Sequence, residues 1–347
     1  MPKEGKKIIK NSLFFVLLFI ATYYFIFRKI DANQLKASLS NANYLFIFIA
    51  IILGGCYIIL ESFNHLRVLR LLNNEVSFKN CLKYSIIGFF FSGITPAATG
   101  GQPVQVYNMH KDGISIANGT LSILIQSFSY LTVNIILGIL GYIFNYSYIN
   151  ELDFIGYFFF FGVIANGAIV LISLIAMFSR KTSHKILNFI VKIVKKFNEE
   201  KALNIKEKYD SQLDEYHNSA KFIISNRGLL LKTFLTNTLQ LLCLHSIAYF
   251  VFLALGVKGL NYIKITFLQA TLYLAVSILP LPGTVGVSET GFSLLYTPMI
   301  ISEGIVGSAM LLTRGISFYL YMIITAVIVI MLTVKGPSKK EKNITKK

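Results

Sequence analysis

Two short stretches decide the fold of this chain: TPAATGGQP at residues 95–103 and LPLPGTVGVSE at residues 279–289, each of which interrupts an apolar segment. In both, a proline is followed four residues later by a glycine, and polar side chains come soon after. A helix broken inside a membrane exposes backbone N–H and C=O groups, which are tolerated only where protein buries them or where they line a wet cavity. The two breaks therefore predict a transport site.

The composition is that of a polytopic membrane protein. Of the 347 residues, 54% are hydrophobic, and apolar runs repeatedly reach about 20 residues, the length of a helix that crosses a bilayer. The 33 Lys and Arg against 16 Asp and Glu would suggest nucleic-acid binding in a soluble protein, but in a membrane protein they mark topology, so we expect no nucleic-acid partner. The three cysteines lack the spacing of a disulfide framework or a metal site, and we expect no metal or other cofactor.

The apolar segments predict an all-α fold with six full spans and two re-entrant broken helical hairpins, in one membrane domain over residues 1–347. The full spans are expected at 8–27, 44–63, 118–145, 154–178, 229–256 and 303–334, and the broken hairpins at 84–111 and 262–298. No small-residue cleavage site follows the first apolar run, so we expect it to be an uncleaved span rather than a signal peptide.

The distribution of Lys and Arg predicts the orientation. With both hairpins returning to the face they enter from, most of the cations fall on the side that holds both termini. The other side receives Arg28, Lys29, Lys36, Lys258 and Lys264. Because cytoplasmic loops carry the excess of positive charge, we expect a multi-pass protein of the plasma membrane with both termini in the cytoplasm.

The predicted domain divides into two halves, 8–178 and 229–334. Between them, residues 180–228 form a connector whose first part has apolar residues at helical spacing with lysines opposite. This pattern favours an amphipathic helix on the cytoplasmic leaflet, with a solvated connector as the alternative. The tail at 335–347 is rich in lysine and is expected to be disordered.

The order of segments predicts an inverted repeat. In each half, a span, a broken hairpin and a second span follow one another, and the extra span at 154–178 makes the second triplet start from the opposite face. The hairpins then enter from opposite sides and their tips meet near the midplane, an arrangement known from secondary transporters. The alternative is a pair of ordinary spanning helices, each kinked at its proline.

The tips of the hairpins are candidate anion sites. Pro96 cannot donate a backbone hydrogen bond, and Gly100 and Gly101 permit a positive φ and a close backbone approach, so helix should resume near Pro103 with free N–H groups at its start. In the second hairpin, Gly283 and Gly286 play the same part ahead of a helix that begins near Val287. We expect these amides to face a phosphate group.

Two charged residues stand inside apolar segments. Glu289 directly follows the second break, and Arg314 lies within the last span. Because a charge exposed to lipid is costly, both should face the interior or each other. We expect Arg314 to bind a lipid phosphate and Glu289 to hold it in place or to take up a coupling proton; a purely structural Glu289–Arg314 bridge is the alternative.

Other polar residues near the breaks are candidates for the lining of a cavity. Those closest to the tips are Thr95, Thr99, Gln102, Tyr107, Asn108 and Ser288. A second group is expected to form hydrogen bonds between helices: Gln126, Asn134, Asn237, Gln240 and His245. Glu61 and His65 are expected at the inner end of the second span, in an interfacial position.

The two breaks and Arg314, within this layout of spans, make the chain resemble the lysylphosphatidylglycerol synthase transmembrane family over about residues 10–335. This family is a flippase-like domain that occurs alone or fused to a cytosolic aminoacyltransferase. In fused members it is associated with moving aminoacylated phosphatidylglycerol to the outer leaflet, which gives resistance to cationic peptides. The resemblance implies a stand-alone member without the aminoacyltransferase domain.

Three functions are consistent with these features. The first is a translocase for an anionic or aminoacylated phospholipid such as lysyl-phosphatidylglycerol, with membrane phospholipids as its partners; the GxxxxGK[ST] motif of ATP hydrolysis is absent from the sequence. The second, implied by the name of the family, is a phosphatidylglycerol lysyltransferase, but a loop of about 50 residues is small for a domain that binds lysyl-tRNA. The third is a membrane scaffold for a lipid-modifying enzyme.

Overall fold

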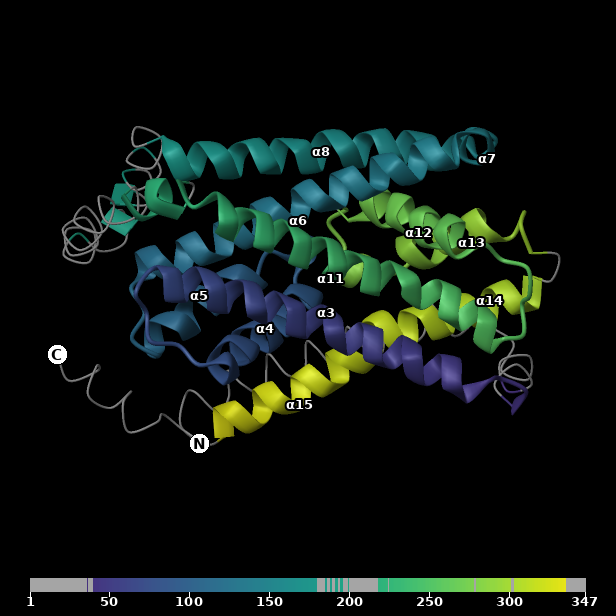
Figure 1. The fold of residues 1–347 in the computed structure, drawn as a ribbon, viewed down its shortest axis with the longest axis horizontal. Helices are drawn as coiled ribbons and strands as arrows, with labels where there is room; N and C mark the ends of the chain where they lie inside the picture. Colours follow the sequence, from purple (N-terminus) through teal and green to yellow (C-terminus); the bar gives the residue numbers. More distant parts are fainter. Residues whose placement is uncertain are drawn as a thin grey trace.

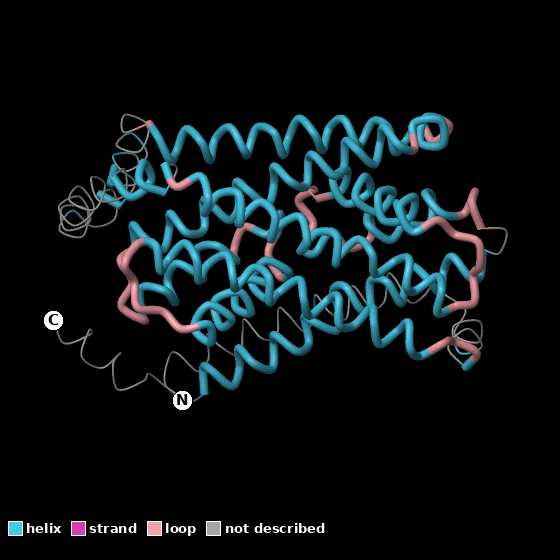
Figure 2. The backbone as a smooth tube through the Cα atoms, viewed as in Figure 1, coloured by secondary structure: helices cyan, strands magenta, loops and turns pink. Residues whose placement is uncertain are grey.

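The computed structural model describes residues 40–179, 218–223, 225–277, 279–300 and 303–334, together with single positions before and between these ranges. All regular secondary structure in these ranges is helical (Figure 2). The predicted first span at 8–27, most of the connector at 180–228 and the tail at 335–347 lie outside the described residues.

Among the described residues, five helices are long and apolar enough to cross a membrane, and they lie at five of the six predicted spans. They are α3 (Tyr44–Leu71), α6 (Ile116–Phe144), α8 (Asp153–Phe178), α11 (Arg227–Ala254) and a last helix formed by α14 (Glu303–Arg314), a π-helical turn (Gly315–Tyr319) and α15 (Leu320–Val334). They run roughly along the long axis of the molecule (Figure 1). The short α7 (Tyr146–Asn150) joins α6 to α8.

Two helical hairpins enter the bundle from opposite ends (Figure 1). The first consists of α4 (Phe78–Gly93), a 3-10 turn (Pro96–Ala98) and α5 (Gly101–Lys111), and the second of α12 (Tyr262–Val276), a 3-10 turn (Pro282–Thr284) and α13 (Val287–Tyr296). The helices pack side by side within each hairpin, so the chain reverses at each break instead of continuing through the bundle. The two breaks contact each other near the middle of the molecule (Figure 2).

The first hairpin is longer than its sequence predicts, because α4 begins at Phe78 rather than at residue 84. The Ser77 hydroxyl caps this helix by accepting a hydrogen bond from the N–H of Asn80 at 3.2 Å. The polar first turn is therefore helix rather than loop. At the base of the hairpin, Lys83 Nζ lies 2.6 Å from an Asp112 carboxylate oxygen and ties α4 to the residue after α5.

The glycines of the two tips have different roles. In the first tip the left-handed residues are Ala97, with φ 50°, and Ala98, with φ 56°, so the expectation of a positive φ at Gly100 and Gly101 is wrong. A Cβ atom on Gly101 would lie 2.6 Å from the carbonyl oxygen of Gly88 in α4, so this glycine serves the close approach of two helices. In the second tip the prediction holds, since Gly283 and Gly286 have φ 57° and 87°.

Helix α8 shows the surface that a bilayer-spanning bundle requires. One face packs on α6 and α12, and buries Ile155 and Phe159 in the largest apolar cluster of the described residues. The other face carries exposed apolar side chains such as Ile164, which is 72% exposed. Exposed apolar surface on this scale marks a contact with lipid or another protein.

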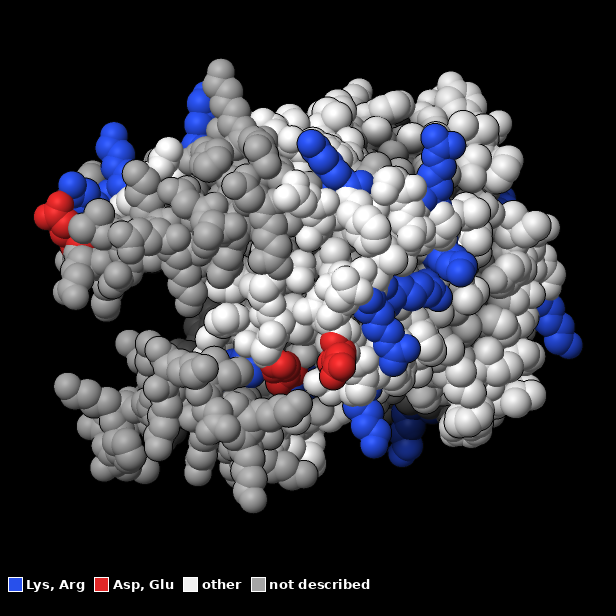
Figure 3. Space-filling model, turned by 60° about the vertical axis from the view of Figure 1, so that its left-hand side comes forward, with Lys and Arg blue, Asp and Glu red and all other residues white. Residues whose placement is uncertain are grey.

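Basic residues gather at one end of the bundle, where α3 and α8 end and α11 begins. Figure 3 turns this end forward, and Lys and Arg side chains stand out among uncharged surface there, with few acidic ones. The described cations of this end include Arg67, Arg70, Lys79, Lys83, Lys111, Lys221, Arg227 and Lys232. At the opposite end, the described residues include Lys258 and Lys264. This asymmetry matches the one counted along the sequence.

The substitution Gly101→Ala tests the packing of the first tip. We expect it to cost about 1–3 kcal/mol in unfolding free energy, because its Cβ meets backbone that cannot rotate away. The matched control is Gly307→Ala in α14, where a Cβ meets nothing within 4 Å and should be neutral or stabilising. Denaturant unfolding in detergent compares the two, and equal stabilities would contradict the packing of α5 on α4.

Candidate functional site

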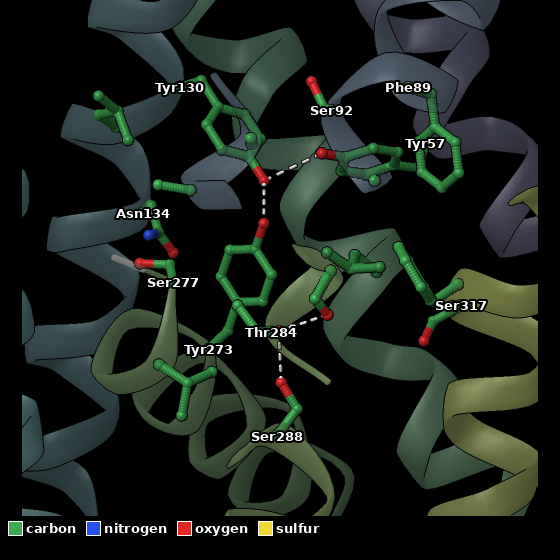
Figure 4. Close-up of a pocket in the computed structure, with 18 of the residues that line it drawn as sticks. Tyr57, Phe89, Ser92, Tyr130, Asn134, Tyr273, Ser277, Thr284, Ser288 and Ser317 are labelled. Atoms are coloured by element: carbon green, nitrogen blue, oxygen red, sulfur yellow. Dashed lines mark hydrogen bonds between the residues drawn. The ribbon is translucent and has the colours of Figure 1, made fainter. Parts of the chain in front are cut away.

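A cavity of about 480 Å³ lies where the two tips meet. The tips contribute Thr99 and Gln102 from the first hairpin and Gly283, Thr284 and Ser288 from the second. Polar side chains from the surrounding helices complete the lining, among them Glu61, Gln105, Gln240 and Arg314. Asn134 and Tyr273 also belong to it (Figure 4). The centre of the bundle therefore holds a chamber with polar groups set in a largely apolar wall.

Arg314 connects the last span to the second tip. Its Nε lies 2.9 Å from Glu289 Oε1, and its Nη2 donates to the carbonyl oxygen of Gly283 at 2.6 Å. Its guanidinium carbon lies 4.8 Å from the centre of the Phe318 ring, close enough for a cation–π contact. These two hydrogen bonds occupy two of the five N–H donors of an arginine, so donors remain for a ligand in the cavity that Arg314 lines.

Glu289 is buried behind this arginine and does not line the cavity. Its second carboxylate oxygen accepts a hydrogen bond from the N–H of Gly286 at 2.7 Å, which caps the first turn of α13. The expected pairing of Glu289 with Arg314 is thus present. Glu289 holds the arginine and the tip at the same time.

The last span departs from α-helical geometry directly after Arg314, in the π-helical turn at Gly315–Tyr319. Such turns occur frequently at functional sites, because they re-aim side chains within a continuous helix. Here Phe318 and Tyr319 both lie against the guanidinium group. Apolar periodicity alone gives no signal for this turn.

The first tip is closed by its own side chains. The Thr95 hydroxyl accepts from the N–H of Gly100 at 2.9 Å and donates to the carbonyl oxygen of Phe91 at 2.7 Å. The predicted free amides are therefore wrong for Gly100 and for Gly286, since Thr95 and Glu289 occupy them. Of the predicted site residues, Thr95, Gly100, Gly101, Gly286 and Glu289 shape the tips from behind the wall of the cavity.

Three tyrosines that the sequence analysis did not single out cross the cavity. The hydroxyl of Tyr130 in α6 lies 3.0 Å from that of Tyr57 in α3 and 2.8 Å from that of Tyr273 in α12 (Figure 4). The available signal was spacing: polar residues recur at every fourth position of α6, which places them on one helix face. They are Asn118, Ser122, Gln126, Tyr130 and Asn134.

Glu61 faces the cavity rather than the membrane interface, which corrects its expected position. Its Oε1 accepts a hydrogen bond from Gln105 Nε2 at 2.9 Å and lies 3.4 Å from His65 Nε2. His65 is fully buried and also contacts the Ser122 hydroxyl at 3.0 Å. Turning toward α5 and α6 gives the carboxylate polar partners that an interface would have supplied as water.

The expected hydrogen bonds between helices form for Gln126 and Asn237. The Asn64 amide of α3 donates to both, at 2.9 Å each, and Gln126 donates to Asn237 at 3.1 Å. This triad joins α3, α6 and α11 between the cavity and the basic end of the bundle. Within the ranges that the structure describes, the side chains of Asn134, Gln240 and His245 make no such bonds.

A groove of about 590 Å³ leads from the cavity to the surface between α5 and α6. It shares Thr99, Gln102 and Ile123 with the cavity, and apolar residues such as Val106 and Leu124 line it further out. At the junction, Gln102 Nε2 donates to the Ser127 hydroxyl at 2.8 Å. The chamber thus continues into a more apolar channel at the side of the bundle.

Comparison with known proteins places this architecture in a family. A family model described as "Lysylphosphatidylglycerol synthase TM region" matches residues 10–325. A UPF0104 membrane protein of Archaeoglobus fulgidus is 23% identical over 293 residues, which cover 82% of this chain and 86% of the relative. UPF0104 membrane proteins of Methanothermobacter thermautotrophicus and Pyrococcus horikoshii are 22% and 24% identical, over 91% and 84% of this chain and 93% and 88% of their own lengths.

A double-mutant cycle tests the pair of Arg314 and Glu289. Glu289→Gln keeps a side chain able to cap Gly286 but leaves Arg314 unpaired, and we expect it to cost about 3 kcal/mol of unfolding free energy. The double variant Glu289→Gln/Arg314→Gln removes both charges and should cost less than the sum of the single changes. Denaturant unfolding in detergent measures all four proteins; additive losses would contradict a direct buried ion pair.

Proposed function

Because the chain belongs to the lysylphosphatidylglycerol synthase TM region family, we propose that this multi-pass membrane protein is a lipid translocase. Its substrate is an anionic or aminoacylated phospholipid, such as lysyl-phosphatidylglycerol, whose head group passes between leaflets through the central cavity. The observation that carries the proposal is that Arg314, which has unused N–H donors, lines the cavity where the two broken helices meet.

The cavity suits a phospholipid head group in size and chemistry. Its volume of about 480 Å³ lies within the range of about 300–1,000 Å³ common for small-ligand sites. A guanidinium group matches the geometry of phosphate oxygens and bonds them in pairs. Since Arg314 is paired with Glu289 and bonded to Gly283, a phosphate would compete with this carboxylate or with the Gly283 carbonyl for the guanidinium. Binding of a phosphate would therefore directly weaken the contacts by which Arg314 holds the second tip.

The side groove favours a lipid over a soluble anion. A phospholipid has to keep its acyl chains in an apolar environment while its head group moves through a polar one. The groove between α5 and α6 connects the two environments, with Gln102 and Ser127 at the junction. A soluble substrate has no need of such a lateral opening.

In this proposal the hairpins are re-entrant and form an inverted repeat across the membrane. The protein lies in the plasma membrane. The basic end of the bundle faces the cytoplasm, and both termini lie on that side. Movement of one half against the other around the touching tips then exposes the cavity to each face in turn. Any aminoacylated lipid would come from a separate lipid-modifying enzyme, and its export would lower the negative charge of the surface and the binding of cationic peptides.

Arg314→Gln should slow the exchange of fluorescent phosphatidylglycerol between leaflets of proteoliposomes by about tenfold or more, because charged hydrogen bonds to phosphate are lost. The decisive protein is the double variant Arg314→Gln/Glu289→Gln, which restores charge balance without restoring a cation. We expect it to fold and to remain slow. The control Lys258→Gln removes an exposed loop cation and should exchange lipid at the wild-type rate. Full activity of the double variant would mean that the pair is only structural.

Thr120→Trp places a bulky side chain in the groove between α5 and α6. If acyl chains pass there, lipid exchange should fall severalfold while the melting temperature in detergent changes little, because the groove is an open surface feature. The matched control is Ile164→Trp on the exposed face of α8, away from the groove. Unchanged exchange in the Thr120 variant would show that lipid reaches the cavity by another path.

A further inference from the structure

Four buried side chains on the wall of the cavity lack hydrogen-bond partners within the described part of the chain: the Thr313 hydroxyl of α14, and three side chains with two polar atoms each. Asn134 of α6 is 0% exposed, as is Gln240 of α11, and His245 of α11 is 1% exposed. Neither polar atom of any of these side chains has a partner among the residues that the structure describes. All three line the cavity.

Their positions converge around the pair of Tyr130 and Tyr273. Asn134 follows Tyr130 by one helical turn on the same face of α6, and Figure 4 shows it beside this pair. The His245 ring lies 5.4 Å from the Tyr273 ring, centre to centre. Gln240 precedes Leu241, which packs in one apolar cluster with Val133, the neighbour of Asn134. Asn134 from α6 and two residues of α11, Gln240 and His245, thus line the same chamber.

A structural role does not account for these groups. Polar atoms buried without partners destabilise a fold, and buried polar groups in native proteins are generally paired with protein, water or ligand. Gln126 and Asn237, on the same two helices, bond to each other and to Asn64, which leaves Asn237 Nδ2 alone without a partner in this pair. Other single atoms of these two helices also lack partners away from the cavity, namely Asn118 Oδ1, Ser129 Oγ and Asn237 Nδ2. Asn134, Gln240 and His245 differ in that both polar atoms of each lack a partner and each side chain lines the cavity, so we look for their partners among the contents of the cavity.

The hydrogen-bonding groups of Asn134, Gln240 and His245 indicate which chemical groups they can bind. Each amide offers N–H donors and a carbonyl acceptor, and a neutral imidazole offers one of each, with no net charge. Hydroxyl groups, which both donate and accept, complement such a set. An ammonium group only donates, so it would leave the N–H donors of these side chains without a partner.

We propose that Asn134, Gln240 and His245 form a subsite for the hydroxyl groups of a polyol head group, while Arg314 takes the phosphate. The substrate class is then a phospholipid whose phosphate carries glycerol or a sugar, rather than a bare phosphate or an amine. This inference rests on the proposed translocase function.

The test compares three acyl-labelled lipids in proteoliposomes: phosphatidylglycerol, phosphatidic acid and phosphatidylethanolamine. Gln240→Leu should slow phosphatidylglycerol exchange by about tenfold, because hydroxyl groups lose their partners, and should leave phosphatidic acid exchange unchanged. The control Thr266→Val removes another buried, unpartnered hydroxyl, in α12, that does not line the cavity, and should change neither rate.

The outcomes separate this inference from the proposed function. Exchange of none of the lipids by the wild-type protein overturns the translocase itself. Three results with Gln240→Leu overturn the polyol subsite alone. The variant slows the exchange of phosphatidylglycerol and phosphatidic acid equally, it changes neither rate, or it slows only the exchange of phosphatidylethanolamine.

A second measurement needs no variant, in case Gln240→Leu does not fold. Soluble glycerophosphoglycerol and dimethyl phosphate carry the same phosphodiester charge, but only the first has hydroxyl groups. We expect glycerophosphoglycerol to inhibit phosphatidylglycerol exchange by the wild-type protein at a concentration about tenfold lower. Equal inhibition by both compounds overturns the subsite.

Discussion

The structure depends on satisfying the backbone where two helices stop inside an apolar bundle. A break at this depth leaves N–H and C=O groups that lipid cannot satisfy. The protein meets the constraint with its own side chains: Thr95 closes the first tip, and Glu289 and Arg314 close the second, at Gly286 N–H and Gly283 C=O respectively. The breaks also contact each other where the two tips meet. The chamber between them follows from this contact.

The tips are closed by interactions of different strength. Neutral hydrogen bonds of a threonine hold the first, whereas a buried ion pair holds the second. A phosphate that enters the cavity would interact directly with the ion pair. We therefore propose that binding of the head group changes the conformation of the second tip first. The tyrosines that bridge α3, α6 and α12 cross the same space, so movement of α12 with its tip would also stretch or break their hydrogen bonds.

Much of this arrangement was predictable from the sequence, because its causes are local or follow from charge. The spacing of proline and glycine located both breaks, apolar length located the spans, and the cost of an isolated charge paired Glu289 with Arg314. The left-handed Ala97 and Ala98 were missed, because alanine rarely adopts a positive φ and the residue type therefore gives no signal for it. The inward position of Glu61 was missed as well, since it depends on how α3 is rotated against α5 and α6.

The central claim is that a phospholipid head group occupies the chamber between the tips while its acyl chains lie in the groove between α5 and α6. Cryo-electron microscopy of the full chain in nanodiscs that contain phosphatidylglycerol tests it most directly. The account predicts density for a phosphate beside Arg314 and for a chain that leaves past Gln102. A chamber filled by packed side chains, with lipid density confined to the outer surface of the bundle, would contradict it.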